Sequence, residues 1–144
     1  MILLDTTVLV YAVGADHPLR RPCRGIVEAI GEGRLEATTT VEVIQEFVHV
    51  RSRSRGRVDA ARLGRSFARL LAPLVRPGAE DLAEGLDLFE HHRQLGPFDA
   101  VLVAAAISAG ATLVSADTAF ARVPGLLHAH PSEALRELGT PGSE

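Results

Sequence analysis

Residues 2–10 have the sequence ILLDTTVLV, and this stretch decides the fold. The three apolar residues 2–4 are typical of a short strand that is buried on both faces of a parallel sheet. Asp5 marks the point where that strand ends, and residues 6–13 predict a short helix directly after it. A buried strand that passes straight into a helix indicates an α/β fold.

The rest of the chain repeats this alternation of short apolar strands and longer helices. Strands are predicted over residues 35–38, 74–75, 112–115 and 127–129, and helices over 18–30, 39–53, 80–95, 97–110 and 132–138, with one more beyond Gly56. This order predicts a three-layer α/β architecture, in which helices flank a mainly parallel central sheet of about four to five strands. We expect residues 1–138 to form a single domain and residues 139–144 to be a disordered tail.

For two of the helices, the sequence also predicts where the helix begins or which side chains face the core. Thr39 and Glu42 have the spacing of a capping box, which predicts that the helix over 39–53 begins at Thr39. In the helix over 80–95, Leu82, Leu86 and Phe89 recur at helical spacing and are predicted to face the core.

The composition excludes several classes of protein. A chain of 144 residues that is 47% hydrophobic suits one folded domain, and its single cysteine excludes a disulfide framework or a cysteine-based zinc site. All 15 basic residues are arginine, so mechanisms that require lysine, such as Walker A nucleotide binding or Schiff-base catalysis, are excluded as well. Asp5 comes too early for a secretory signal, and no segment suits a membrane span, so we expect a soluble, cytoplasmic protein.

Positive charge is concentrated in one segment. Residues 49–69 hold seven arginines and one acidic residue, which gives a local net charge of +6 against −9 for the rest of the chain. Such a segment suits contact with a polyanion, and it equally suits a solvated helix face.

Three aspartates lie where the active sites of parallel α/β sheets are found, at the carboxyl ends of strands. Asp5 and Asp117 follow predicted strands, and Asp99 lies in the first turn of an apolar helix. Each of them also suits a helix cap or first turn. Asp99 is the hardest to explain in that way, because a carboxylate buried without a partner costs several kcal/mol or stays protonated.

Glu46 adds a fourth acidic residue. It lies one turn beyond Glu42 on the polar face of the helix over 39–53, and unlike Glu42 it has no capping role. Four carboxylates in a chain without lysine suggest a site for a hard cation, Mg²⁺ or Mn²⁺. The six histidines show no ligand spacing, and Cys23 beside Arg24 is at most mildly activated.

Four blocks of the sequence carry a resemblance to a known family: residues 2–12, 40–47, 99–106 and 113–120. Through these blocks the sequence resembles the PIN-domain ribonucleases, specifically the VapC toxins of bacterial type II toxin–antitoxin systems. The resemblance extends from Met1 to about Leu138 and implies a PIN-like fold. It maps the four-acid site of that family onto Asp5, Glu46, Asp99 and Asp117.

The resemblance also implies how these residues act. Asp5 and Asp99 would be Mg²⁺ ligands, Glu46 and Asp117 would complete the pocket, and Ser115 and Thr6 would support it. Mn²⁺ is a possible substitute for Mg²⁺. A metal-activated water would cleave RNA to leave a 5′-phosphate and a 3′-hydroxyl.

Further roles concern the partners of the protein. Arg53, Arg55 and Arg57 would hold the RNA backbone. The resemblance further implies a VapB-like antitoxin as partner and a homodimer or a larger toxin–antitoxin assembly.

Other functions fit the residues less well. A PIN-fold module that binds RNA or a partner without turnover is the main alternative. A phosphatase of the haloacid dehalogenase type would need a second aspartate two residues after Asp5, where Thr7 stands, and that class and receiver domains both need a lysine. A DNA nuclease would share the same metal chemistry.

Overall fold

The computed structural model describes residues 1–138, and the predicted tail over 139–144 lies outside the described residues. The elements are β1 (Ile2–Leu4), α1 (Thr6–Val13), α2 (Arg20–Gly31), β2 (Ala37–Thr38), α3 (Val41–Arg55), α4 (Arg57–Leu70), α5 (Ala79–His91), α6 (Pro97–Ser108), β3 (Thr112–Val114), the 3₁₀ helix η1 (Thr118–Arg122), β4 (Leu127–Ala129) and α7 (Pro131–Leu138).

The four strands form one parallel sheet with the order β2-β1-β3-β4. This arrangement confirms the predicted α/β fold with a mainly parallel sheet. The chain passes from β1 to its neighbour on one side and later returns as β3 on the other, where Leu4 pairs with Val114. The carboxyl ends of β1 and β3 therefore meet at a topological switch point, where open α/β sheets bind their ligands.

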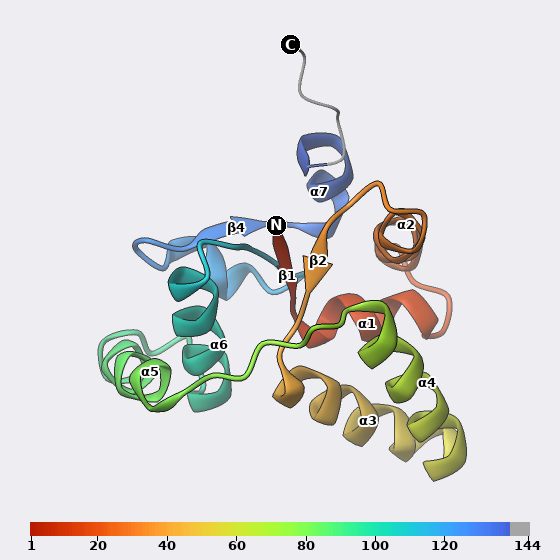
Figure 1. The fold of residues 1–144 in the computed structure, drawn as a ribbon, viewed down its shortest axis with the longest axis horizontal. Coiled ribbons are helices and arrows are strands. Elements are labelled where there is room, and N and C mark those ends of the chain that lie inside the picture. Colours follow the sequence, from red (N-terminus) through yellow and green to blue (C-terminus); the bar gives the residue numbers. More distant parts are fainter. Residues whose placement is uncertain (139–144) are drawn as a thin grey trace.

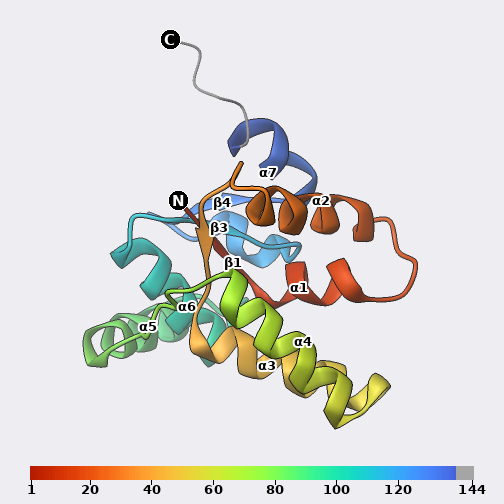
Figure 2. The same cartoon turned by 45° about the vertical axis from the view of Figure 1, so that its right-hand side comes forward.

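Helices cover both faces of the sheet and extend from its carboxyl end. In Figure 1, α1 and α2 lie on one side of the strands and α5 and α6 on the other, which gives the three predicted layers. Helices α3 and α4 pack against each other as a hairpin that projects away from the strands, as Figure 2 also shows. Gly56 joins them with a φ of 84°, a left-handed conformation that favours glycine.

The core explains why the central strands are apolar throughout. Every residue of β1 is buried, and so are Leu113 and Val114 of β3. The hairpin has its own aromatic contact, because the rings of Phe47 and Phe67 meet edge to face at 5.1 Å between centroids.

Two predictions about residues 39–75 are wrong. The N-cap of α3 is Thr40, whose hydroxyl accepts a hydrogen bond from the Val43 N–H, whereas the Thr39 hydroxyl donates to the carbonyl of Leu4. Residues 74–75 form no strand of the sheet, because Val75 makes only an isolated bridge to Thr40.

The predicted orientation of α5 is also wrong. Leu82, Leu86 and Phe89 are 50%, 51% and 45% exposed, and the buried residue of this helix is Gly85. Gly85 lies directly against Val101 of α6, where a Cβ atom would come within 2.9 Å of the Val101 Cα. The glycine allows the two helix backbones to approach closely, and this turns the leucine stripe away from the core.

Among residues 1–138, none of the helices is long and apolar enough to cross a membrane.

Candidate carboxylate site

Asp5 anchors the candidate site at the end of β1. Its side chain is buried at 5% exposure and makes no capping hydrogen bond, although the residue occupies the N-cap position of α1. The Ser115 hydroxyl donates to Asp5 Oδ2 at 2.6 Å, and the Thr7 hydroxyl donates to the same oxygen at 3.0 Å. The capping role considered for Asp5 is therefore wrong, and two hydroxyl groups hold its carboxylate instead.

The loop after β3 supplies the next part of the site. The backbone N–H of Asp117 donates to the Ser115 hydroxyl at 3.0 Å, and the N–H of Ala116 donates to the Thr7 hydroxyl at 3.1 Å. These bonds tie the β3 loop to the start of α1. Asp117 itself is exposed and caps η1, where its Oδ1 accepts from the Ala119 N–H at 2.9 Å. For Asp117, unlike Asp5, the capping role is real.

Glu46 reaches the site from α3. The hydroxyl of Thr6 donates to Glu46 Oε2 at 2.9 Å, so consecutive threonines serve two different carboxylates. Glu42, one turn earlier, is exposed and lines the same hollow as Glu46 and Asp99.

Asp99 lies in the first turn of α6, where it is half-buried. The pKa of its carboxyl is raised to about 6, mainly by burial and in addition by the negative charges of Asp5, Glu46 and Asp117. A backbone hydrogen bond from Gly96 partly opposes this shift in pKa. The mutual repulsion shows that β1, α3, α6 and the β3 loop bring the four predicted carboxylates into one electrostatic group.

The chemistry of this group suits a hard divalent cation. All four side chains offer oxygen donors, and the ion pairs resolved among residues 1–138 lie elsewhere, on Glu32 and Asp59. Within that range no three carboxylate, histidine or cysteine side chains are arranged as ready ligands of one ion. The exposed side chains of Glu46 and Asp117 would therefore have to turn toward Asp5 and Asp99 to close around a cation.

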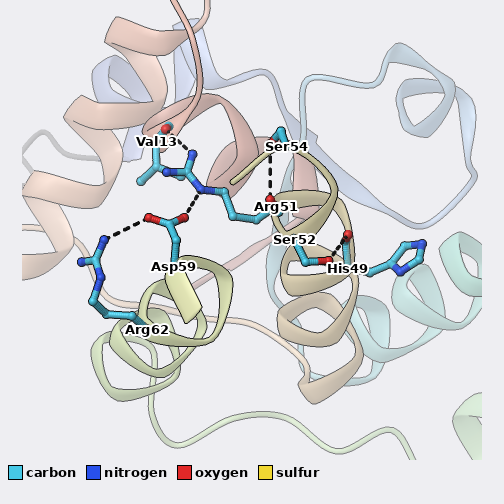
Figure 3. Close-up of polar contacts among 7 residues, drawn as sticks. All are labelled: Val13, His49, Arg51, Ser52, Ser54, Asp59 and Arg62. Carbon is cyan, nitrogen blue, oxygen red and sulfur yellow. Dashed lines mark hydrogen bonds and ion pairs between the residues drawn. The ribbon is translucent and has the colours of Figure 1, made fainter. Parts of the chain in front are cut away.

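The arginine-rich segment divides into two parts in the structure. Arg51 donates to Asp59 at 2.6 Å and to the carbonyl of Val13 at 2.8 Å, and Arg62 donates to the other Asp59 oxygen at 3.1 Å (Figure 3). The Arg51 guanidinium lowers the pKa of Asp59, and Arg62 lowers it to a lesser extent. This network binds the end of α1 to both helices of the hairpin.

The other part of the segment is the tip of the hairpin. The three predicted RNA-contacting residues, Arg53, Arg55 and Arg57, are exposed where α3 passes into α4. Arg55 lies nine residues beyond Glu46, so the tip is about 14 Å along the helix from that carboxylate. The structure thus separates the basic tip from the acidic group.

Some residues near the site were missed or misjudged from sequence. Thr7 was missed as a partner of Asp5, although the Asp-Thr-Thr run gave a signal for it. His128, whose Nε2 lies 3.1 Å from the Ser115 carbonyl, had no such signal. Cys23 is buried, and this raises the pKa of its thiol to about 12, so the mild activation considered for it is wrong.

Comparisons with known proteins show the family to which the chain belongs. The model of the PIN domain family matches residues 2–126. The chain is 57% identical to Ribonuclease VapC7 of Mycobacterium tuberculosis over 136 residues, which are 93% of this chain and 94% of that protein. It is 32% identical to Ribonuclease VapC23 of the same organism, over 79% of this chain and 90% of that protein.

Two solved structures share the fold. A toxin–antitoxin complex from Klebsiella pneumoniae superposes with a TM-score of 0.67 at 17% identity, covering 91% of this chain and 98% of that one. VapBC2 from Rickettsia felis, bound to a DNA fragment from its promoter, gives a TM-score of 0.70 at 20% identity, covering 90% and 98%. The chain therefore belongs to the PIN-domain family and, within it, to the VapC group.

Proposed function

We propose that this protein is a metal-dependent endoribonuclease and the toxin of a toxin–antitoxin pair. The observation that carries the proposal is the convergence of four carboxylates from four separate elements, where the charges of the other three add to burial in raising the pKa of Asp99 to about 6. Folding brings like charges together at a cost in free energy, and a bound divalent cation would offset that cost. The names of the VapC relatives as ribonucleases support the choice of RNA as substrate.

In this proposal the carboxylates have unequal roles. Asp5 and Asp99, the two less exposed, would hold Mg²⁺ or Mn²⁺, and Glu46 and Asp117 would complete the pocket. A bound divalent cation lowers the pKa of its water ligand and neutralises charge on the scissile phosphate. Asp99 must be ionised to take part, and binding of a cation favours that form.

The hydroxyl groups orient the carboxylates. Ser115 and Thr7 both donate to Asp5 Oδ2, and these two hydrogen bonds fix the rotation of that side chain. Thr6 donates to Glu46 Oε2 and keeps that side chain beside the group. The two hydrogen bonds to Asp5 hold its carboxylate in place before RNA binds, and such preorganisation favours catalysis.

Partners form the second part of the proposal. A VapB-like antitoxin is supported by the VapC relatives and by the fold shared with two toxin–antitoxin complexes. Self-association as a homodimer, or within a larger assembly with the antitoxin, is supported by exposed apolar side chains such as Leu82 and Leu86. Arg53, Arg55 and Arg57 would bind the RNA backbone, supported by their exposure at the tip of the hairpin.

The experiment is cleavage of a pool of single-stranded and structured RNA by the purified protein, freed of partner, with Mg²⁺, Mn²⁺ or chelator. We expect metal-dependent cuts that leave 5′-phosphate ends, and we expect Asp5→Asn and Asp99→Asn to lower the rate at least 100-fold, on the order of one lost ligand's contribution. Asp87→Asn, an exposed aspartate of α5, is the matched control and should cleave as the wild type does.

Two results would contradict the proposal. A folded wild-type protein that binds RNA but leaves it intact with either metal would indicate a binding module without turnover. Cleavage that survives both Asp5→Asn and Asp99→Asn would show that the activity resides elsewhere or in a contaminant.

A further inference from the structure

The hollow that Glu42 lines together with Glu46 and Asp99 lies between α3 and α6. It has a volume of about 340 Å³, and Glu46 and Asp99 form part of its wall. The other lining side chains include Gln45 and His49 of α3 and Phe98 of α6. Neither the carboxylate site nor the arginine tip uses these three residues.

Phe98 is the unusual member of this set. Its side chain is 78% exposed, although it immediately precedes Asp99 in the first turn of α6. Exposing a phenylalanine to this extent forgoes the free energy of burying an aromatic ring, so its position is not explained by the stability of the isolated chain. Its ring forms a wall of the hollow beside a candidate metal ligand.

The negative charge of the hollow limits which groups can bind in it. Glu42, Glu46 and Asp99 line it, and no arginine does. Such walls repel the phosphates of an RNA chain but accept a flat, uncharged group. The side chains of Gln45 and His49 offer hydrogen-bond donors and acceptors to the edge of that group. Figure 3 shows the His49 ring directed away from the Arg51–Asp59 pair, on a different side of α3.

We propose that this hollow is a nucleobase subsite, in which a base next to the scissile phosphate stacks on Phe98 and its edge meets Gln45 and His49. The inference rests on the proposed ribonuclease function and extends it to substrate selection. An aromatic ring accepts the face of any base, so Phe98 supplies affinity. Gln45 and His49 then favour some bases over others through hydrogen bonds to their edges.

The test compares Phe98→Ala with Phe98→Trp, which keeps an aromatic face, and with Phe89→Ala. Phe89 is another exposed phenylalanine, 45% accessible, and it does not line the hollow. Cleavage of a mixed-sequence RNA pool with Mg²⁺ gives KM and kcat. Stacking is measured separately with a short single-stranded RNA that contains 2-aminopurine, with Ca²⁺ as the cation. The mass of each variant in solution is measured by light scattering.

We expect Phe98→Ala to raise KM about 5- to 100-fold, the loss of one base–aromatic stack, while kcat changes little. It should also abolish the quenching of 2-aminopurine fluorescence that the wild type produces. Phe98→Trp should restore both, and Phe89→Ala should match the wild type. Gln45→Leu should alter which bases are enriched beside the cut sites without abolishing the quenching.

The subsite is overturned if Phe98→Ala cleaves with the KM of Phe89→Ala and quenches 2-aminopurine as the wild type does. It is also overturned if Phe98→Ala raises KM while halving the mass in solution, because the residue would then belong to a subunit interface. Absence of cleavage by the wild type would instead overturn the proposed function, and the fluorescence measurement would still decide whether a base stacks on Phe98.

Discussion

Asp99 has a pKa of about 6 because it is partly buried and faces three other carboxylates. Asp5, in contrast, receives two hydroxyl hydrogen bonds, and Glu46 receives one. Partial burial and the neighbouring negative charges therefore disfavour the ionised form of Asp99 in the folded state. This leads to a prediction about the stability of the metal-free protein.

The prediction concerns Asp99→Asn in the presence of chelator. Because the folded state raises the pKa of Asp99 above its ordinary value of 3.8, that carboxyl favours the folded state most below pH 4. This contribution is lost as the pH rises through about 6. Asparagine removes the titration, so Asp99→Asn should raise the free energy of unfolding at pH 8 by about 1 kcal/mol, an amount reduced by solvent screening.

Urea denaturation at pH 4, 6 and 8 checks this expectation, with Asp87→Asn as the control. The stabilising effect of Asp99→Asn should shrink toward zero at pH 4, whereas the control should show no such trend. A gain that is larger at pH 4 than at pH 8 would contradict the assigned direction of the pKa shift.

At the scale of elements, the α3–α4 hairpin carries both an acidic and a basic function. The first half of α3 contributes Glu46 to the carboxylate group, and the tip of the hairpin presents three exposed arginines. The Arg51–Asp59–Arg62 network fixes the hairpin to the end of α1. Two of the seven arginines in the segment are therefore structural, and the three at the tip are exposed and accessible for the proposed contact with RNA.

Replacing Arg53, Arg55 and Arg57 together by glutamine should weaken RNA binding and reduce its salt dependence. For single-stranded RNA, three lost phosphate contacts should lower the slope of log K against log salt concentration by about 2. Fluorescence anisotropy at several salt concentrations measures this slope. The control is the double variant Arg21→Gln/Arg34→Gln, whose changes lie on α2 and just after it, and it should bind RNA with almost the wild-type slope. If the control and the tip variant lost RNA affinity equally, a specific role for the tip would be refuted.

The contact between α5 and α6 positions the first turn of α6, which carries Phe98 and Asp99. A Cβ atom at Gly85 would come within 2.9 Å of the Val101 Cα and 3.1 Å of its backbone nitrogen, so one helix must shift. Gly85→Ala should therefore lower the free energy of unfolding by about 1–3 kcal/mol and slow RNA cleavage. Gly31→Ala is the control, because the nearest atom to a Cβ there is 3.9 Å away. Equal stability of the two variants in urea denaturation would contradict the close helix contact.

For the whole molecule, the sequence predicts the architecture because each strand is short, apolar and followed by a helix. The carboxylates could be predicted too, because Asp5 and Asp117 follow strands and Asp99 interrupts an apolar helix. The orientation of α5 could not be predicted. The spacing of the leucines shows which residues share one face of the helix, but it does not show how closely Gly85 allows a neighbouring backbone to approach. Likewise, three consecutive threonines at 38–40 all suit a helix cap, and only the position of β1 decides that Thr39 bonds to Leu4 instead.

The pairing of charges was equally beyond prediction from the sequence. Arg51 and Arg53 differ by only two positions on α3, yet one is held by Asp59 and Val13 while the other is exposed. That distinction depends on where α1 and α4 end in space. The exposure of Phe98 also depends on tertiary structure, because a phenylalanine in the first turn of an apolar helix is ordinarily part of the core.

The most direct test of the four-carboxylate site measures Mn²⁺ affinity by calorimetry and RNA cleavage on the same preparations of wild type, Asp99→Asn and Asp87→Asn. The site predicts that Asp99→Asn loses Mn²⁺ affinity about 10- to 100-fold, as expected for a damaged metal site, together with cleavage, while Asp87→Asn keeps both. Unchanged Mn²⁺ affinity in Asp99→Asn, or cleavage that persists without measurable metal binding, would contradict the account.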